Sequence, residues 1–545
     1  MKKKLMVLLM VVVSTFSFLA CGGIDPEKPQ KLEIYVYNAG YGYQWAEDIL
    51  AAFKEEPWVK EKYPELETSF MKDELGTKAS ELLAAKKKIN KYDILMGTGL
   101  ETLLGPGSPA ADLTESVYDS KVPGEDILFK DKMIQSYLSA AAYNGKGIEY
   151  GEQKWYQVNW ASGMTGMIYN EDRLTALGFN VPNTSDELVA IMRDVKALNG
   201  THPAYPANKN QTAANLQTSY ATYGASSYAQ YLFYTWWAQY ETVGGYNDFY
   251  NGIDSEGARS PEVLRQKGLL KAYETLESYM HKDMGYTWIN PNTDRSAYRE
   301  TQNRVLLGNA LFMANGDWVD NELAGMRQDL ITKDGHADTV KMMRTPVISA
   351  IREKTPSITS DAMLSAVVAA IDAGESGYET VTSADYAVIE AARKVVYSIG
   401  PYHSAVIPDY ASGKAVAIDF LRYMATDKAN EIYIKATNGA SLPFNYDVKT
   451  KNPQLYGQIS SMQQGRLDYF AEMDISILPV ANSFPLARYG SFSPLSSGSP
   501  MTDFTGGASK GTYASVAEMI YNRGINYWTE NGNSRWNTAV SQAGL

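Results

Sequence analysis

Within residues 30–100 the apolar side chains change from a strand period to a helix period and back, and this change constrains the fold most. Residues 32–37 alternate between apolar and polar, as in a strand, and the apolar residues of 45–53 then recur at helical spacing. A second helix is expected over 78–88, and residues 93–96 form a short apolar strand. Strands and helices that alternate with short links predict a parallel sheet.

Helix-start signals recur along the rest of the chain. Thr184 and Glu187 have the spacing of a capping box, and Ser260 followed by Pro261 is typical of a first helical turn. Further helices are expected over residues 416–424 and 427–436. The fold class is therefore α/β, and a length of 545 residues predicts two or more domains.

The first 20 residues have the composition of an export signal. Three lysines at positions 2–4 precede the apolar run 5–18, which is too short to span a bilayer as a stable helix. Cys21, the only cysteine, follows Leu19 and Ala20 and resembles the lipidated cysteine of a bacterial lipobox. We predict a lipoprotein signal peptide over 1–20, a lipid at Cys21 and a linker over 21–30. The alternative is an ordinary signal peptide beside a chance cysteine. Either way the protein is exported, and with the lipid it is anchored to the cell membrane on its extracellular or periplasmic face.

Charge and cysteine content exclude several functions. Removal of residues 1–20 takes away three of the 50 basic residues and none of the 62 acidic ones, so 47 − 62 gives a net charge near −15. This acidity argues against binding to nucleic acid. A single cysteine excludes an internal disulfide and a cysteine-based metal cluster. The four histidines are isolated in sequence, and no His-Glu-x-x-His spacing occurs, so we expect no metal and no cofactor.

Four stretches, taken in order, resemble the extracellular solute-binding protein family that includes maltose-binding protein. They are residues 92–95, 163–188, 310–318 and 415–443. The resemblance implies two α/β lobes joined by crossover strands, with a ligand cleft between them. It implies crossovers near 159–163, 345–350 and 442–447. Lobe one would comprise 31–158 plus 352–442, and lobe two 162–346 plus 448–545.

The resemblance also implies a function. It predicts the solute-binding component of a carbohydrate ABC importer, a monomer that closes on an oligosaccharide and delivers it to the permease subunits in the membrane. Composition agrees, because the chain has 10 Trp and 39 Tyr but only 15 Phe. Flat rings with a polar edge suit the apolar faces and hydroxyls of sugars.

Candidate ligand-binding residues lie where the family places its contacts: after the first strand, after strand 93–96, at the first crossover, in the aromatic run 231–237 and beyond strand 310–314. They are Tyr41, Tyr43, Thr98, Glu101, Trp160, Ser162, Phe233, Tyr234, Trp236, Asp317, Trp318 and Tyr402. Trp318 emerges past the carboxyl end of a strand, where ligands gather in open α/β sheets, and matches the family's Gly-x-Trp position. The alternative for each aromatic residue is a place in the core.

Two other functions remain open at this point. With 62 carboxylates, a catalytic pair for a secreted lipoprotein glycoside hydrolase is available in principle. A binder of a non-sugar solute would share the same fold. We expect no enzyme, since the ordered resemblance covers most of residues 31–445 and predicts no hydrolysis, and since no Gly-x-Ser-x-Gly elbow or Walker loop occurs.

Overall fold

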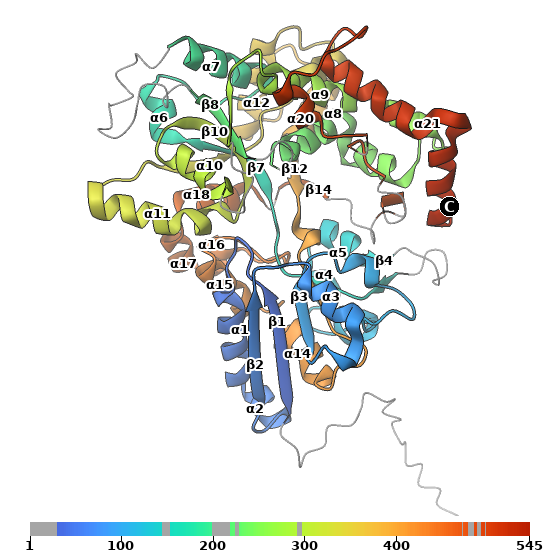
Figure 1. The fold of residues 1–545 in the computed structure, drawn as a ribbon. Helices are drawn as coiled ribbons and strands as arrows, with labels where there is room; N and C mark the ends of the chain where they lie inside the picture. The colour runs from blue at the N-terminus through green and yellow to red at the C-terminus, as the bar shows by residue number, and fades with distance from the viewer. Residues whose placement is uncertain are drawn as a thin grey trace, which may run out of the picture.

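The computed structural model describes residues 30–143, 153–198, 218–223 (by their backbone), 228–290, 297–470, 472–477, 484, 486–487, 492–495 and 497–545. The predicted signal peptide, Cys21 and nearly all of the linker lie outside these residues. The predicted α/β class is confirmed, because the chain forms two lobes that each contain a five-stranded mixed sheet flanked by helices (Figure 1). No helix among the described residues is long and apolar enough to cross a membrane.

The first lobe is built on a sheet in the order β2-β1-β3-β13-β6. Its strands are β1 (Lys31–Tyr37), β2 (Glu67–Asp73), β3 (Ile94–Gly97), β6 (Val158–Asn159) and β13 (Ser404–Val406). β1 runs parallel to β2 and β3, and β13 runs antiparallel to β3 and β6. The predicted strand–helix–strand unit is therefore present, with its parallel pairing.

Helices and short segments complete the first lobe. They are α1 (Gln44–Glu55), α2 (Pro57–Lys62), α3 (Lys78–Ala85), η1 (Lys86–Lys88), η2 (Glu101–Leu103), η3 (Thr114–Tyr118), α4 (Phe129–Lys132), α5 (Gln135–Ala141), β4 (Ala142–Tyr143), β5 (Lys154–Trp155), α14 (Lys414–Tyr423) and α15 (Asp427–Ala436). The apolar stripe of α1 is buried, as its spacing predicts.

The second lobe is built on a sheet in the order β11-β7-β10-β8-β9. Its strands are β7 (Thr165–Asn170), β8 (Thr218–Tyr223), β9 (Thr287–Asn290), β10 (Ala310–Gly316) and β11 (Val340–Met343). β10 is buried along its whole length and pairs with β7 on one side and β8 on the other. This central position fits its continuous apolar sequence.

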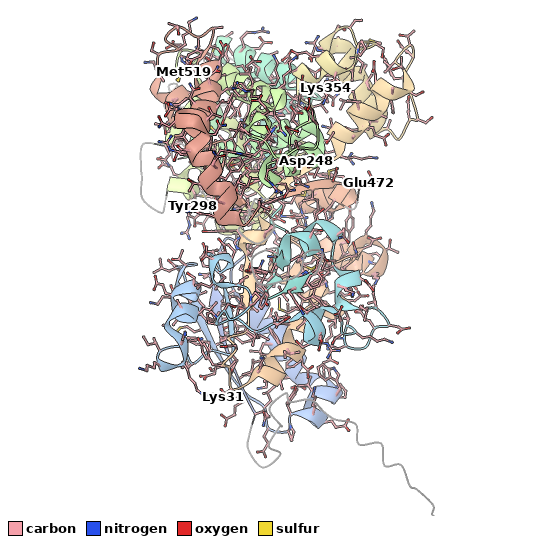
Figure 2. The ribbon with its side chains drawn as sticks, turned by 90° about the vertical axis from the view of Figure 1, so that its right-hand side faces the viewer. Lys31, Asp248, Tyr298, Lys354, Glu472 and Met519 are labelled. Carbon is pink, nitrogen blue, oxygen red and sulfur yellow. The ribbon has the colours of Figure 1, made fainter. Side chains whose placement is uncertain are left out.

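The helices of the second lobe surround that sheet. They are α6 (Glu171–Ala176), α7 (Ser185–Ala197), α8 (Ala229–Asn251), η5 (Pro261–Arg265), α9 (Lys267–Met280), α10 (Ala297–Leu306), α11 (Val319–Asp334), α18 (Ser461–Phe470), α20 (Pro500–Gly506) and α21 (Val516–Ala543). The predicted helix starts are present: the Thr184 side chain accepts a hydrogen bond from Glu187 N, and that of Ser260 accepts one from Glu262 N. A side view separates the lobes clearly, with Lys31 in the lower one and Asp248, Lys354 and Met519 in the upper one (Figure 2).

Residues 349–398 differ from the expectation, which assigned 352–442 to the first lobe. They form η6 (Ser349–Lys354), α12 (Asp361–Asp372), α13 (Ser383–Lys394) and β12 (Val395–Ser398), and β12 pairs with β14 (Asp474–Ile477). α13 and β12 pack on α8, so this segment belongs with the second lobe. The chain also does not cross near 345–350, since Val347 N donates to Asn183 O (2.8 Å) beside α7.

Three crossovers join the lobes instead near residues 160–164, 398–404 and 437–461. The first lies where it was expected, and η7 (Gly400–Tyr402) belongs to the second. The third is longer than expected: residues 439–441 already lie at the junction, but α16 (Val448–Lys451) and α17 (Pro453–Gln458) still pack on α15 of the first lobe, and the chain enters the second lobe only at α18, which packs on β11. The crossovers touch one another: Ser162 N donates to Ser441 O (2.9 Å), and Ile399 N donates to Gly163 O (2.9 Å).

Candidate ligand-binding site between the lobes

The carboxylate of Asp317 lies at the junction of the crossovers, just past the end of β10. Its Oδ1 accepts a hydrogen bond from Tyr41 OH of the first lobe (2.7 Å), and its Oδ2 accepts one from Ser162 Oγ of the first crossover (2.7 Å). Its backbone N donates to Met164 O (2.9 Å), and its backbone O accepts from Gln463 Nε2 (2.6 Å). One buried aspartate therefore contacts both lobes and a crossover.

Arg466, which is fully buried on α18, completes this polar network. Its guanidinium donates to Gly439 O (2.7 Å), Ser441 Oγ (3.2 Å) and Gln463 Oε1 (2.8 Å), and lies 3.9 Å from Asp317 Oδ2. Burial raises the pKa of the Asp317 carboxyl, and the Arg466 charge opposes that shift. Neither Arg466 nor Gln463 was predicted, because the sequence after residue 453 carries no pattern that ties it to the junction.

Trp318 begins α11 directly beside this network. Its ring covers Gly316, where an added Cβ would lie 2.0 Å from a ring carbon, and it reaches Gly40 of the first lobe, where a Cβ would lie 2.6 Å away. The absence of a side chain at both glycines lets the indole approach the backbone of each lobe closely. Tyr41 meets the indole edge-on, with 6.0 Å between ring centroids. Only 5% of Trp318 is exposed.

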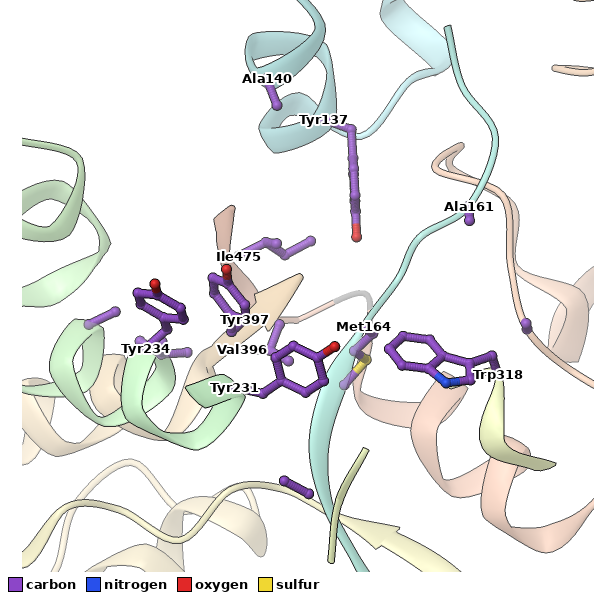
Figure 3. Close-up of a cluster of buried hydrophobic side chains, with 14 of the residues drawn as sticks. Tyr137, Ala140, Ala161, Met164, Tyr231, Tyr234, Trp318, Val396, Tyr397 and Ile475 are labelled. Carbon is purple, nitrogen blue, oxygen red and sulfur yellow. The ribbon is translucent and has the colours of Figure 1, made fainter. Parts of the chain in front are cut away.

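A row of aromatic rings continues from Trp318 along the second lobe (Figure 3). Tyr231 is perpendicular to the Trp318 ring at 6.3 Å, and Tyr397 follows at 6.1 Å from Tyr231. Tyr234 stacks on Tyr397 at 4.7 Å, and the half-buried Tyr228 stacks on Tyr231 at 5.2 Å. We call these five residues the aromatic row. Tyr228 is half-buried, and the other four rings are buried and pack on one another in this closed form, with phenol and indole polar groups at their edges.

The first lobe contributes a second aromatic group below the junction. Trp160 stacks on Trp45 at 5.1 Å and lies 4.8 Å from His403, and Tyr37 stacks on His403 at 6.2 Å. Burial lowers the pKa of His403 to about 4, so its imidazole is neutral at physiological pH. Among the described residues, Trp160 Nε1 and His403 Nδ1 have no hydrogen-bond partner.

Further hydrogen bonds hold the two lobes together at the start of α11. Asn321 Nδ2 donates to Gly40 O (2.8 Å), and Asn438 Nδ2 donates to Asp320 Oδ2 (2.7 Å). The Glu322 carboxylate lies against Gly40, and burial raises its pKa to about 7. The lobes are thus in direct contact, as in a closed clamp.

The structure brings five of the predicted site residues together. Tyr41, Trp160, Ser162, Asp317 and Trp318 form one connected group. Tyr234 joins the same region through the aromatic row. Tyr228, Tyr231 and Tyr397 were not predicted as site residues. Tyr231 belonged to a recognised aromatic run, but only the helix register could show which of its rings face the junction.

Two other predicted aromatics have a different place. Phe233 stacks on Tyr273 of α9 at 4.7 Å, and Trp236 Nε1 donates to Pro346 O (3.0 Å). Both are fully buried on sides of α8 that pack inside the second lobe. Their contacts are those of residues in the core of the second lobe.

The remaining predicted residues are dispersed on the first lobe. Thr98 directly follows β3, is buried, and donates its N–H to Gly76 O (3.0 Å). Glu101 is half-buried, and burial raises the pKa of its carboxyl. Tyr402 is 38% exposed and neighbours His403, whereas Tyr43 lies under Lys72 Nζ (3.6 Å from the ring centroid). Because Gly97 pairs with Ser404, Thr98 and Tyr402 lie near the same end of the sheet.

Comparison with solved structures identifies the fold. An ABC substrate-binding protein from Listeria monocytogenes, solved in complex with cycloalternan, matches with a TM-score of 0.55 and 12% identity over 92% of this chain and 99% of its own. A probable secreted solute-binding lipoprotein from Streptomyces coelicolor matches with a TM-score of 0.55 and 13% identity over 92% and 100%. The GacH receptor of Streptomyces glaucescens, solved unliganded and with acarbose, matches at 0.52 and 13% over 92% and 98%.

These matches cover nearly the whole of the compared proteins, so the chain has the two-lobe fold of solute-binding proteins, as the sequence predicted. No family model matches the sequence. No curated protein matches it either. At 12–13% identity the likeness establishes the fold, and the function has to be argued from the site.

Proposed function

We propose that this protein is the solute-binding component of a carbohydrate ABC importer, which captures an oligosaccharide between its lobes and delivers it to the membrane permease. The observation that carries the proposal is the aromatic row at the junction, in which Tyr228, Tyr231 and Trp318 lie beside the crossovers. Sugar rings present apolar faces that stack on such side chains, while their hydroxyls pair with polar groups at the ring edges. The acarbose and cycloalternan ligands of the compared structures support a carbohydrate.

The residues divide into two proposed roles. Tyr228, Tyr231 and Trp318 form the stacking surface of the second lobe. Thr98, Glu101 and Tyr402 supply polar contacts from the first lobe, near the ends of its strands. A ligand held by both sets stabilises the closed form over the open one, and the permease recognises that closed form.

A second set of side chains sets the geometry of closure. Tyr41, Trp160, Ser162 and Asp317 are proposed to hold the crossovers and to join the lobes once they meet. The polar atoms of Tyr41, Ser162 and Asp317 are already engaged with one another, so these residues act on the ligand by positioning the stacking surface. No catalytic residue, metal or cofactor takes part in this proposal.

Sugar binding is tested by thermal unfolding and calorimetry with a panel of oligosaccharides of different linkage. A true ligand at a hundred times its dissociation constant should raise the free energy of unfolding by about 2.7 kcal/mol. Tyr231→Ala should weaken binding, whereas Tyr43→Ala, on the first lobe under Lys72, serves as the matched control. Stabilisation by a non-sugar solute alone would contradict the proposal.

The same incubations test the enzyme alternative. A binding protein returns the oligosaccharide intact, so chromatography of the mixture should show a single unchanged sugar. Release of shorter sugars by the wild-type protein would identify a secreted glycoside hydrolase instead. Substitution of one carboxylate after another would then find the catalytic pair.

Export and anchoring complete the proposal. We infer that residues 1–20 are removed, that Cys21 receives the lipid and that residues 21–30 tether a monomeric binding protein to the outer face of the cell membrane. Cys21→Ala should give an exported protein that no longer sediments with membranes, with unchanged melting temperature. Persistent membrane association of this variant would contradict the lipid site.

A further inference from the structure

We propose that Asp172, His336 and Asp338 form a binding site for a divalent transition-metal ion, with Zn²⁺ as its representative. The three residues are far apart in sequence, but their ligand atoms all lie within 4.8 Å of one another. They lie at the edge of the second-lobe sheet, where α6 begins and where the chain turns from α11 into the edge strand β11. This site is independent of the carbohydrate proposal.

The distances suit a small metal ion. His336 Nε2 lies 3.3 Å from Asp338 Oδ1 and 3.8 Å from Asp172 Oδ2. Zn²⁺ binds nitrogen and carboxylate oxygen at about 2.0–2.2 Å, so two ligand atoms on a tetrahedral ion lie roughly 3.3–3.6 Å apart. One imidazole and two carboxylates make a mixed nitrogen and oxygen set that suits first-row transition ions better than Mg²⁺ or Ca²⁺. The ion would therefore need only small side-chain adjustments.

The two carboxylates are already oriented by neighbouring groups. Asp338 Oδ2 accepts hydrogen bonds from Arg173 Nε (2.8 Å) and Asn170 Nδ2 (3.0 Å), so Oδ1 is directed at His336. Asp172 Oδ2 accepts one from Thr339 N (2.9 Å). Such outer contacts fix the direction of metal ligands and lower the entropic cost of binding. Only 9% of the Asp338 side chain is exposed, whereas 69% of His336 is, so an ion can enter from solvent.

The chain contains a matched comparison in His281, whose Nδ1 lies 3.6 Å from the single carboxylate of Asp283. The His281 Nδ1 accepts a hydrogen bond from Asp283 N (3.3 Å) and has only that one carboxylate beside it, whereas His336 faces two carboxylates, so only His336 has the third ligand that a metal site needs.

A bound ion would cross-link two segments of the second lobe. It would join the first turn of α6 to the segment between α11 and β11, after α11 has ended at Gly335 in the left-handed conformation (φ 73°). α11 begins at Trp318 and carries the contacts to Gly40 of the first lobe. Fixing its far end would stiffen the helix that faces the junction.

The test is calorimetric titration of the chelator-treated mature protein with Zn²⁺, followed by thermal unfolding with and without the ion. We expect one ion per chain and a raised melting temperature. His336→Ala and Asp172→Asn should each weaken binding at least about tenfold and remove the thermal shift. His281→Ala should leave both unchanged.

The variants remain interpretable because His336 is mostly exposed, and their melting temperatures without Zn²⁺ report whether the fold is kept. Co²⁺ provides a second readout, since a nitrogen and oxygen site of low coordination number gives visible absorption that His336→Ala should abolish. Zn²⁺ binding by His336→Ala with wild-type affinity would overturn the proposal. So would a wild-type protein that takes up no Zn²⁺ at millimolar concentration.

Discussion

Tyr41→Phe is the substitution that most directly tests how the lobes close. It removes one hydroxyl and keeps the ring, so the edge-on contacts with Trp160 and Trp318 remain. The lost interaction is the hydrogen bond to Asp317 Oδ1 (2.7 Å), which joins the first lobe to the second. Because the bond connects different lobes, it is present in the closed form and lost when they separate.

The expected size follows from the chemistry of that bond. Its acceptor is a buried carboxylate, and hydrogen bonds to charged groups contribute about 1.5–3 kcal/mol. Since about 1.4 kcal/mol changes an equilibrium tenfold, Tyr41→Phe should lower the ratio of closed to open protein roughly ten- to 150-fold. If the open form dominates without ligand, the dissociation constant for the sugar rises by the same factor.

Small-angle scattering of the protein without and with its ligand measures the first effect, and calorimetry measures the second. Tyr41→Phe should be more extended than the wild type when unliganded, and should need more ligand to reach the compact state. Tyr43→Phe is the control, because its ring lies under Lys72 of the first lobe and no described interlobe bond involves it. Equal compactness and equal affinity in Tyr41→Phe and wild type would refute the reasoning.

Three further predictions concern packing and pH. Gly316→Ala should lower the free energy of unfolding by about 1–3 kcal/mol in chemical denaturation, because the new Cβ would lie 2.0 Å from the Trp318 ring. Gly325 on α11 has open space around it, so Gly325→Ala should instead raise the free energy of unfolding by about 0.5–1 kcal/mol. Burial lowers the pKa of His403 to about 4 from its usual value near 6.5, so the unfolded chain binds more protons than the folded one between these two pH values. The free energy of unfolding should therefore fall by about 3 kcal/mol as the pH drops from 6.5 to 4. A denaturation midpoint that does not change over this pH range would contradict the prediction. Burial raises the pKa of Glu322 from its usual value near 4.5 to about 7, so protonation favours closure. Ligand affinity should therefore weaken as the pH rises from about 4.5 to 7 and level off above 7, and Glu322→Gln should remove this dependence in binding titrations.

The first lobe's frame and the junction were largely predictable from local pattern. β1, α3 and β3 lie where the alternation and helical spacing placed them. α3 buries one face, whereas β1 and β3 lie inside the sheet and are buried on both faces. Trp318 also lies at the end of a central strand as expected, since an apolar strand followed by Asn-Gly-Asp has to turn there. Its burial by Tyr41 and Gly40 was not predictable, because those contacts come from the other lobe.

Which α8 residues join the aromatic row could not be predicted from the sequence, for a physical reason. Residues 231–240 are all buried, so this half of α8 has no exposed face and its hydrophobic residues show no stripe. Sequence alone then cannot tell which rings face the junction. The structure separates Tyr231 and Tyr234, which point toward Tyr397, from Phe233 and Trp236, which point into the lobe.

The lobe boundary around residues 349–398 was hidden for a related reason. α12 and α13 are ordinary amphipathic helices, and an apolar stripe fits any apolar surface of either lobe. What decides their place is the pairing of β12 with β14, a contact between segments about 80 residues apart. A local period carries no information about such a pairing.

The buried pair of Asp317 and Arg466 explains how the crossovers between the two lobes are held in one arrangement. Ion pairs of this kind seldom add net stability, because the loss of hydration offsets the attraction. Here every oxygen of Asp317 is hydrogen bonded, and Arg466 is bound to both Gly439 and Ser441 of the third crossover. A shift of any crossover would leave a buried charge without hydrogen-bond partners, and a buried charge without partners is strongly destabilising. The network of hydrogen bonds around Asp317 and Arg466 therefore permits few arrangements of the crossovers. It also holds the neighbouring aromatic row in position, although the rings of the row form none of these hydrogen bonds.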